Sequence, residues 1–204
     1  TNNITQLNDY YNVDNPANTN WQDEVLRTGF SHNHNVSING GNEKTNYSAS
    51  LNFQDREGVV RGTNMDRLNA RTFVQTKALN NRLELALSLN ASIRNSSTGP
   101  TDIQGRSVLD AMYYYNPLVP VKNEDGTWYR NLNISQNYNP LSMINEDRYD
   151  TKEKLLQGTA QATLHIIDGL DWNLNLSYQN QQYIYNIYNT TQTQLPSVIS
   201  KHGQ

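Results

Sequence analysis

The 204-residue chain carries a net charge of −3 at pH 7, is 35% hydrophobic and has a mean hydropathy of −0.80. The slight negative charge argues against a nucleic-acid partner, which usually binds a basic surface, and the absence of Cys excludes disulfides and thiolate metal sites. No apolar run approaches the roughly 18 residues that a transmembrane helix needs.

The first half of the chain is predicted to form four strands after an irregular lead-in. Residues 1–31 are polar, with a short helical turn expected at Trp21 to Arg27 after Asn20 as N-cap. Tight turns are predicted at Gly40-Gly41-Asn42 and at Asn80-Asn81. Within the segment 32–94, the strands are expected at about 32–39, 45–54, 67–77 and 82–94.

The fourth of these strands, RLELALSLNASIR (82–94), has the clearest pattern. All its large apolar residues fall on one parity, and Glu84, Ser88 and Asn90 are among the residues on the other. An i, i+2 repeat places every apolar side chain on one face of a strand. Globular strands usually run to about 5–6 residues, whereas a membrane-spanning strand needs roughly 9–11. The strand is therefore predicted to separate lipid from water.

The second half begins with a very long connection, expected at 95–153. It contains a predicted short helix from Val108 to Tyr115, ended by Asn116-Pro117. Two further strands are expected at 154–167 and 171–182, forming a hairpin across Asp168-Gly169. The remaining residues, 183–204, are predicted to begin another polar loop.

Short and long connections thus alternate along the chain, as in outer-membrane barrels with tight periplasmic turns and longer extracellular loops. The polar strand faces are rich in Asn, Gln, Ser and Thr, whereas a soluble surface is normally about 25–35% charged. We therefore expect an all-β, antiparallel transmembrane β-barrel segment with long extracellular loops, contributing about six strands to a larger barrel. The alternative is a soluble β-sandwich acting as a glycan-binding or interaction domain, which would bury the leucines of 82–94 under a second layer.

Four stretches carry a resemblance to a known family. They are NTNWQDEVLRTGFSHNHNVSINGGNEKTNYSASLNFQDREGVVRG (Asn18 to Gly62), DRLNARTFVQTKALNNRLELALSLNAS (Asp66 to Ser92), NPLVPVKNEDGTWY (Asn116 to Tyr129) and NPLSMINE (Asn139 to Glu146). In sequence and in order they resemble the barrel of the SusC/RagA family of TonB-linked outer-membrane proteins.

The resemblance implies a longer parent protein with a TonB box, a plug domain and a barrel of about 22 strands. It implies import of oligosaccharides or oligopeptides across the outer membrane of a Gram-negative bacterium. The implied partners are a SusD-like surface lipoprotein acting as a lid, TonB acting through the N-terminal part, outer-membrane lipid, and the glycan or peptide substrate. On this basis the chain is expected to be a non-enzymatic part of the barrel wall.

Aromatic residues of the long connection are the candidates for contact with substrate or lid. They are Tyr113, Tyr114, Tyr115, Trp128 and Tyr129. Their flat faces suit sugar rings or peptide side chains, with amides such as Asn131 and Asn133 supplying hydrogen bonds. The alternative is that these rings pack the loop onto its neighbours or onto the lid.

Charged and titratable residues suggest no catalytic centre, and no cofactor or metal is expected. Arg71 and Arg94 are predicted to project into the lumen, where they either set the charge of the pore or pair with a plug carboxylate. His32 and His34, at i, i+2, have a spacing seen in some metal sites but are expected to be bystanders. The Glu146-Asp147 pair is expected to be a solvated loop feature.

Overall fold

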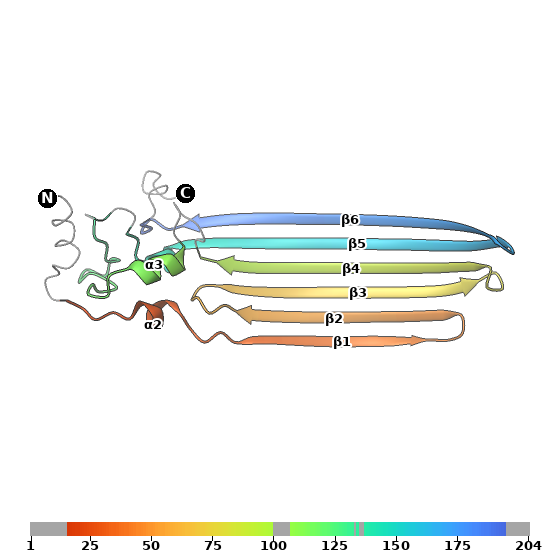
Figure 1. The fold of residues 1–204 in the computed structure, drawn as a ribbon, viewed down its shortest axis with the longest axis horizontal. Coiled ribbons are helices and arrows are strands. Elements are labelled where there is room, and N and C mark those ends of the chain that lie inside the picture. Colours follow the sequence, from red (N-terminus) through yellow and green to blue (C-terminus); the bar gives the residue numbers. More distant parts are fainter. Residues whose placement is uncertain (1–15, 100–106, 133, 135–136, 195–204) are drawn as a thin grey trace.

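The chain forms one antiparallel sheet with its longer loops gathered at one end (Figure 1). The computed structural model describes residues 16–99, 107–132, 134 and 137–194. The strands follow chain order across the sheet: β1 (Ser31–Gly41), β2 (Thr45–Glu57), β3 (Asn64–Ala78), β4 (Leu83–Thr98), β5 (Asp147–Ile167) and β6 (Leu170–Asn189). The predicted all-β class and its six antiparallel strands are confirmed.

Tight turns close the three hairpins at one end of the sheet, on the right in Figure 1. The β1–β2 turn is held by the Asn42 side chain, whose Oδ1 accepts from the backbone N–H groups of Lys44 and Thr45 at 2.9 and 2.8 Å. The β3–β4 turn runs through Asn80 and Asn81 with positive φ, a conformation that Asn tolerates better than most residues. The connections β2–β3 and β4–β5 leave the opposite, loop end.

Three short helices lie at the loop end among the described residues: α2 (Trp21–Val25), α3 (Val108–Tyr114) and α4 (Pro140–Glu146). Each begins at a side-chain cap. Asn20 accepts from the backbone N–H of Gln22, Ser107 and Asp110 form a capping box, and Asn139 precedes Pro140. Within the described part of the chain, no helix is long and apolar enough to cross a membrane.

The register separates the side chains into two faces of the sheet, because directly paired residues lie on the same face. One row across the sheet reads Tyr47, Val74, Leu87, Ala160, Leu176. We call this side the apolar face; its band comprises Val36, Ile38, Tyr47, Ala49, Leu51, Phe53, Leu68, Ala70, Thr72, Val74, Leu83, Leu85, Leu87, Leu89, Ala91, Ile93, Leu156, Gly158, Ala160, Ala162, Leu164, Trp172, Leu174, Leu176 and Tyr178. The opposite side, here called the polar face, carries mainly Asn, Gln, Ser and Thr.

The apolar face has no second layer over it among the described residues. Leu87 is 57% exposed and Leu89 is 45% exposed, whereas the buried residues Val25 and Met143 lie at the loop end. The sheet therefore holds its apolar side chains outward and the molecule places its core elsewhere. This arrangement differs from a sandwich, in which two sheets bury their facing residues.

The apolar band crosses the sheet diagonally. Val36 on β1 shares a row with Leu51 and Leu156, but that row ends on β6 at Asn180. On β6 the apolar residues are displaced toward the tight turns, from Trp172 to Tyr178. A level apolar band on such a sheet requires strands that lean relative to it, as barrel strands do by about 35–45°.

Several strands extend farther toward the loops than their sequence predicts. β4 ends at Thr98 rather than 94, β5 starts at Asp147 rather than 154, and β6 ends at Asn189 rather than 182. Apolar and polar residues no longer alternate there, since β6 closes on YIYNIYN, yet the backbone ladder continues. The expected connection 95–153 thus contains α3, α4 and the start of β5, and 183–204 contains the end of β6. Of these segments, 100–106, 133, 135–136 and 195–204 lie outside the described residues, as do residues 1–15 of the lead-in.

Candidate functional site

The loop end of the sheet carries a small packed structure of its own. We call it the loop-end layer; it comprises the described residues of 16–30, 58–63, 107–146 and 190–194. Its apolar residues form two adjoining clusters of buried side chains: Val25, Val108, Ala111, Tyr138, Leu141 and Met143 in one, and Trp21, Tyr115 and Val119 in the other.

Asn139 joins the segments of this layer. Its side-chain oxygen accepts from the N–H groups of Leu141 and Ser142 at 3.0 and 3.4 Å, which caps α4. Its Nδ2 donates to the carbonyl oxygens of Val121 and Tyr129 at 2.8 and 3.3 Å. Asn139 is fully buried, so these bonds replace the water that its amide would otherwise bind.

The residues after β6 return to the same place. Gln194 accepts from the Asn139 backbone N–H at 2.9 Å and donates through Nε2 to the Trp128 carbonyl at 3.1 Å. Thr193 donates its hydroxyl to Asp147 Oδ1 at 2.7 Å. The segment before β5 and the segment after β6 therefore contact each other and complete the loop-end layer.

The Glu146-Asp147 pair is not the solvated loop feature that its sequence predicts. Glu146 accepts from Trp128 Nε1 at 2.7 Å and from the hydroxyl of Thr190, and Asp147 is buried. Within the described residues, Asp147 Oδ2 is buried and has no hydrogen-bond partner. The polar partners of Glu146 and Asp147 come from segments distant in the sequence. The nearby turn residues therefore did not indicate that Asp147 is buried.

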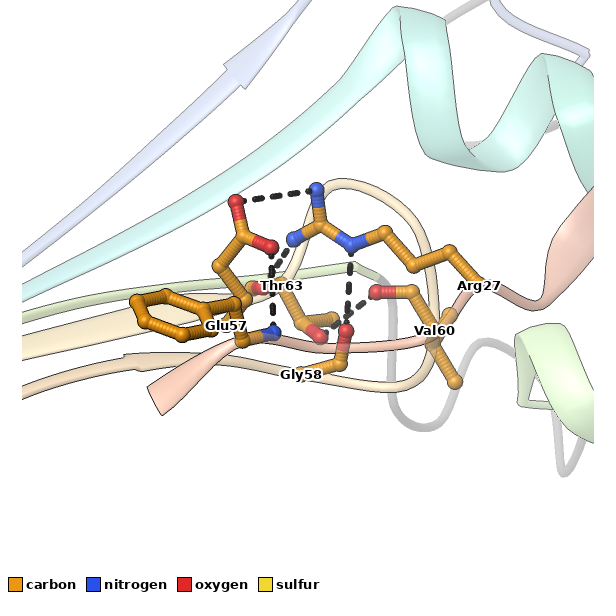
Figure 2. Close-up of polar contacts among 6 residues, drawn as sticks. Arg27, Glu57, Gly58, Val60 and Thr63 are labelled. Atoms are coloured by element: carbon orange, nitrogen blue, oxygen red, sulfur yellow. Dashed lines mark hydrogen bonds and ion pairs between the residues drawn. The ribbon is translucent and has the colours of Figure 1, made fainter. Parts of the chain in front are cut away.

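Arg27 ties the lead-in to the β2–β3 connection (Figure 2). Its Nε donates to the Gly58 carbonyl at 3.1 Å and its Nη2 to the Thr63 carbonyl at 3.0 Å. Its Nη1 lies 3.6 Å from Glu57 Oε1. One guanidinium thus satisfies two carbonyls of a short connection and a carboxylate, which fixes how β1 enters the sheet.

Two of the five predicted aromatic residues are open to solvent. Tyr113 and Tyr114, on α3, are 75% and 62% exposed, and their rings meet edge to face with centroids 5.1 Å apart. Large exposed apolar surfaces are often contact sites. Contact of this pair with substrate or lid remains a prediction.

The other three aromatic candidates belong to the packing of the loop-end layer. Tyr115 is buried edge to face against Trp21, with centroids 4.8 Å apart, and its hydroxyl donates to the Tyr129 carbonyl at 2.8 Å. This burial raises the pKa of the Tyr115 phenol well above its usual value. Trp128 lies under Lys122, with Nζ 4.4 Å from the ring centroid. Two amides were named with these rings. The Asn131 carbonyl accepts from the Ile134 backbone N–H at 3.3 Å, and Asn133 lies outside the described residues.

The two arginines predicted to face the lumen both lie on the polar face. Arg94 Nη2 contacts Glu153 Oε2 on the neighbouring strand at 2.7 Å, and Gln181 donates to the other carboxylate oxygen at 2.9 Å. Arg71 is exposed and pairs in register with Ser50 and Asn90. Arg94 therefore has a partner within this chain, and its role in a pore stays a prediction.

The histidines lie on different faces. His32 and His34 belong to β1 and fall on the apolar face, opposite Asp55 and Phe53, and their ring centroids are 5.1 Å apart. His165, on the polar face, contacts Asp171 at 2.6 Å across the β5–β6 hairpin. Among the described residues, no three His, Asp or Glu side chains are grouped so that they could hold a metal ion.

A long-stranded sheet with one apolar and one polar face, tight turns at one end and a loop layer at the other, is the architecture of a section of an outer-membrane barrel wall. Comparison with known proteins shows which proteins the chain is similar to. "TonB-dependent receptor P3" of Formosa agariphila is 26% identical over 174 residues, which cover 83% of this chain and 17% of that receptor. "TonB-dependent receptor SusC" of Bacteroides thetaiotaomicron is 32% identical over 131 residues, covering 60% of this chain and 12% of that receptor.

Solved structures agree in fold. The RagAB peptide importer in its closed-closed state matches with a TM-score of 0.68 at 16% identity, covering 89% of this chain and 22% of that chain. The RagAB peptide transporter matches with a TM-score of 0.69 at 14% identity, covering 95% and 24%. No family model matches the chain. These relatives confirm the predicted resemblance to SusC/RagA proteins, and the chain spans less than a quarter of the length of each.

Proposed function

We propose that this chain is a section of the barrel wall of a TonB-dependent importer in the outer membrane of a Gram-negative bacterium. The observation that carries the proposal is the single sheet whose apolar face is exposed and uncovered among the described residues. A soluble protein rarely leaves so large an apolar surface in water. The same surface is favourable against lipid.

The length of the apolar band supports a membrane crossing. On β4 it runs from Leu83 to Ile93 without interruption, which matches the roughly 9–11 residues of a tilted transmembrane strand. In hydrocarbon the outer edges of β1 and β6 must also be hydrogen-bonded. We infer that both edges pair with further strands of a barrel of about 22 strands.

The polar face would line the passage. Its side chains hydrogen-bond across strands, as between Ser88 and Thr159 at 2.5 Å, Asn69 and Asn90 at 3.0 Å, and Thr163 and Asn173 at 2.8 Å. Such neutral pairs stabilise this part of a water-facing wall. Neutral hydroxyl and amide groups suit oligosaccharides or oligopeptides as cargo.

The loop-end layer would face the outside of the cell and receive that cargo. Its exposed Tyr113 and Tyr114 are the candidate contacts for substrate or for a SusD-like lid lipoprotein. The parent protein would draw energy through TonB. The relatives reported above are named receptors, importers or transporters, and we assign this chain no catalytic role.

The lid contact can be tested in the full-length protein. Replacing both Tyr113 and Tyr114 by Ser should weaken co-purification of a SusD-like lipoprotein, whereas Leu109→Ser, also exposed on α3, serves as the matched control. If the tyrosine variant and the Leu109→Ser control both recover as much lipoprotein as the wild type, the tyrosine pair does not contribute to the contact.

The alternative of a soluble sandwich is disfavoured by the exposed leucines of β4, since a sandwich would cover them. Cell fractionation decides between the two. The full-length protein should sediment with outer membranes and enter solution only with detergent. Release into buffer after washing with salt and urea would contradict the importer proposal.

A further inference from the structure

Four arginines gather on the polar face of three neighbouring strands. Arg56 lies on β2, Arg67 and Arg71 on β3, and Arg94 on β4. Arg67 and Arg94 are directly opposite each other in the register. Arg56, Arg67 and Arg71 are exposed. We call this set the arginine patch.

Negative charge is directed away from the patch. On β2, β3 and β4, which are described in full, Asp55, Glu57 and Asp66 have the parity of the apolar face. Glu84 is on the polar face but pairs with Lys77 at 3.1 Å near the tight turns. Glu153 on β5 contacts Arg94. A chain of net charge −3 therefore presents a positive surface on this part of its polar face.

An anion bound near Arg67 would stabilise this grouping. Like charges directly opposite on a sheet destabilise it, and Glu153 compensates for Arg94 alone. Guanidinium groups bind carboxylate and sulfate through paired hydrogen bonds, and they do so better than lysine. Beside Arg71 the face is hollowed by about 640 Å³, with Ser50, Phe73 and Asn90 also lining the hollow. The hollow is open to solvent, and Arg71 is the member of the arginine patch that lines it.

Flat aromatic surfaces lie on the same face. The register row that contains Arg67 and Arg94 continues through Glu153 to Tyr183 on β6. Tyr183 is 62% exposed, and Tyr185 follows on the same face, its ring centroid 6.1 Å from that of Tyr149. Exposed Tyr rings offer an apolar surface with a polar edge, which suits the faces of sugar rings.

From this juxtaposition we propose that the polar face binds an acidic oligosaccharide. The arginine patch takes its carboxylate or sulfate groups, and Tyr183 and Tyr185 stack on its rings. A neutral glycan would offer Arg67 and Arg71 no opposite charge. The inference rests on the proposed importer function, in which this face lines the passage, and it narrows the cargo to anionic glycans.

The test is direct binding to the purified full-length protein in detergent, measured by calorimetry. The probes are oligogalacturonate and a sulfated galactan oligosaccharide, each beside its uncharged counterpart, the methyl ester and the desulfated sugar. The wild type should bind at least one acidic probe, with an affinity that falls as salt is raised. The uncharged counterpart should bind at least about tenfold more weakly, the equivalent of 1.4 kcal/mol.

The double variant Arg67→Gln/Arg71→Gln should lose about tenfold or more in affinity for that acidic probe. Its matched control is Lys152→Gln/Lys154→Gln, which removes the same charge from β5 at a similar level but on the opposite face. The control should retain wild-type affinity. Equal losses in the two variants, equal binding of charged and uncharged sugars, or binding to neither acidic probe would overturn the inference. Tighter binding of a Glu-rich octapeptide than of either sugar would also overturn it.

Failure of the importer proposal would look different. That proposal fails if the full-length protein is released from membranes without detergent. Suppose instead that the protein stays in the membrane and that the double variant binds acidic sugars as tightly as the wild type. That result would overturn only the anionic-glycan inference and would leave the importer proposal intact.

Discussion

The sheet and the loop-end layer place their apolar residues in opposite ways. In the loop-end layer, Val25 and Met143 are fully buried among side chains from distant segments. In the sheet, Leu85, Leu87 and Leu89 point away from the rest of the described chain and remain exposed. The first arrangement is that of a protein core in water, and the second suits the contact with lipid proposed above.

The two regions also treat polar groups differently. The loop-end layer buries Asn139 and Asp147 and satisfies most of their polar atoms with side chains or carbonyls. The sheet keeps most of the polar side chains of its central rows on one open face, and several of them form cross-strand pairs. A polar substitution that is tolerated on the open face of the sheet should therefore be destabilising in the buried core of the loop-end layer. Substitutions can test this contrast.

The largest effect is expected for Met143→Ala in the loop-end layer. Removing a fully buried Met side chain leaves a cavity and should cost about 2–5 kcal/mol of local stability. Hydrogen exchange in the full-length protein should show faster exchange across α3 and α4 with β3 and β4 unchanged. Met65→Ala, on the polar face, is the control. Equal protection in both variants would mean that the layer has no cooperative core.

Leu87→Arg should have a comparable but smaller effect on the sheet. It places a charge in the apolar band and should cost about 2–4 kcal/mol if that band faces lipid. The readouts are the yield of assembled protein in outer membranes and the urea midpoint in vesicles. Asn175→Arg, on the polar face at a similar level, should assemble normally. Normal assembly of Leu87→Arg would show that the face assignment is reversed.

Asn139→Ala should cost about 1–3 kcal/mol within the loop-end layer, because it removes a helix cap and two buried donations. Asn139→Asp separates these contributions, since it keeps the acceptor that caps α4 and loses the Nδ2 donor. Proteolysis near 137–146 should be fastest for the Ala variant and intermediate for Asp. Identical rates for wild type and Ala would contradict the assigned role.

Tyr115→Phe should have the smallest effect, about 0.5–1.5 kcal/mol, since it removes one buried hydrogen bond to the Tyr129 carbonyl and keeps the ring against Trp21. Tyr113→Phe, at an exposed position of α3, should be neutral. Exchange rates of α3 amides measure both. A larger effect for Tyr113→Phe would show that the Tyr113 hydroxyl contributes to the stability of α3.

Much of the sheet could be predicted from sequence because alternation is a local signal. The parity of Leu83 to Ile93 identified the apolar face, and the register confirms that Tyr47, Val74 and Leu176 share it. The strand ends could not be predicted, since past the apolar band the two parities no longer differ in polarity. The prediction consequently missed Tyr183 and Tyr185 as members of the polar face.

The loop-end layer was much less accessible to prediction. The Asn116-Pro117 break indicated the end of α3. Ser107 and the Asn139-Pro140 pair are start signals from which the first residue of α3 and the whole of α4 could have been found. The burial of Tyr115, Asn139 and Asp147 depends on segments up to about a hundred residues away, such as Trp21 and Gln194. No local pattern encodes which polar residue such a structure will enclose.

The slanted course of the apolar band has a consequence for pore size. Between β1 and β6 the residues of the apolar band shift toward the tight turns. A ring of such strands therefore closes only when its last strand pairs with its first several residues out of register. That accumulated offset, together with the number of strands, fixes the radius of the ring. The spacing of leucines and tyrosines along six strands therefore already encodes part of the width of the opening through which cargo would pass.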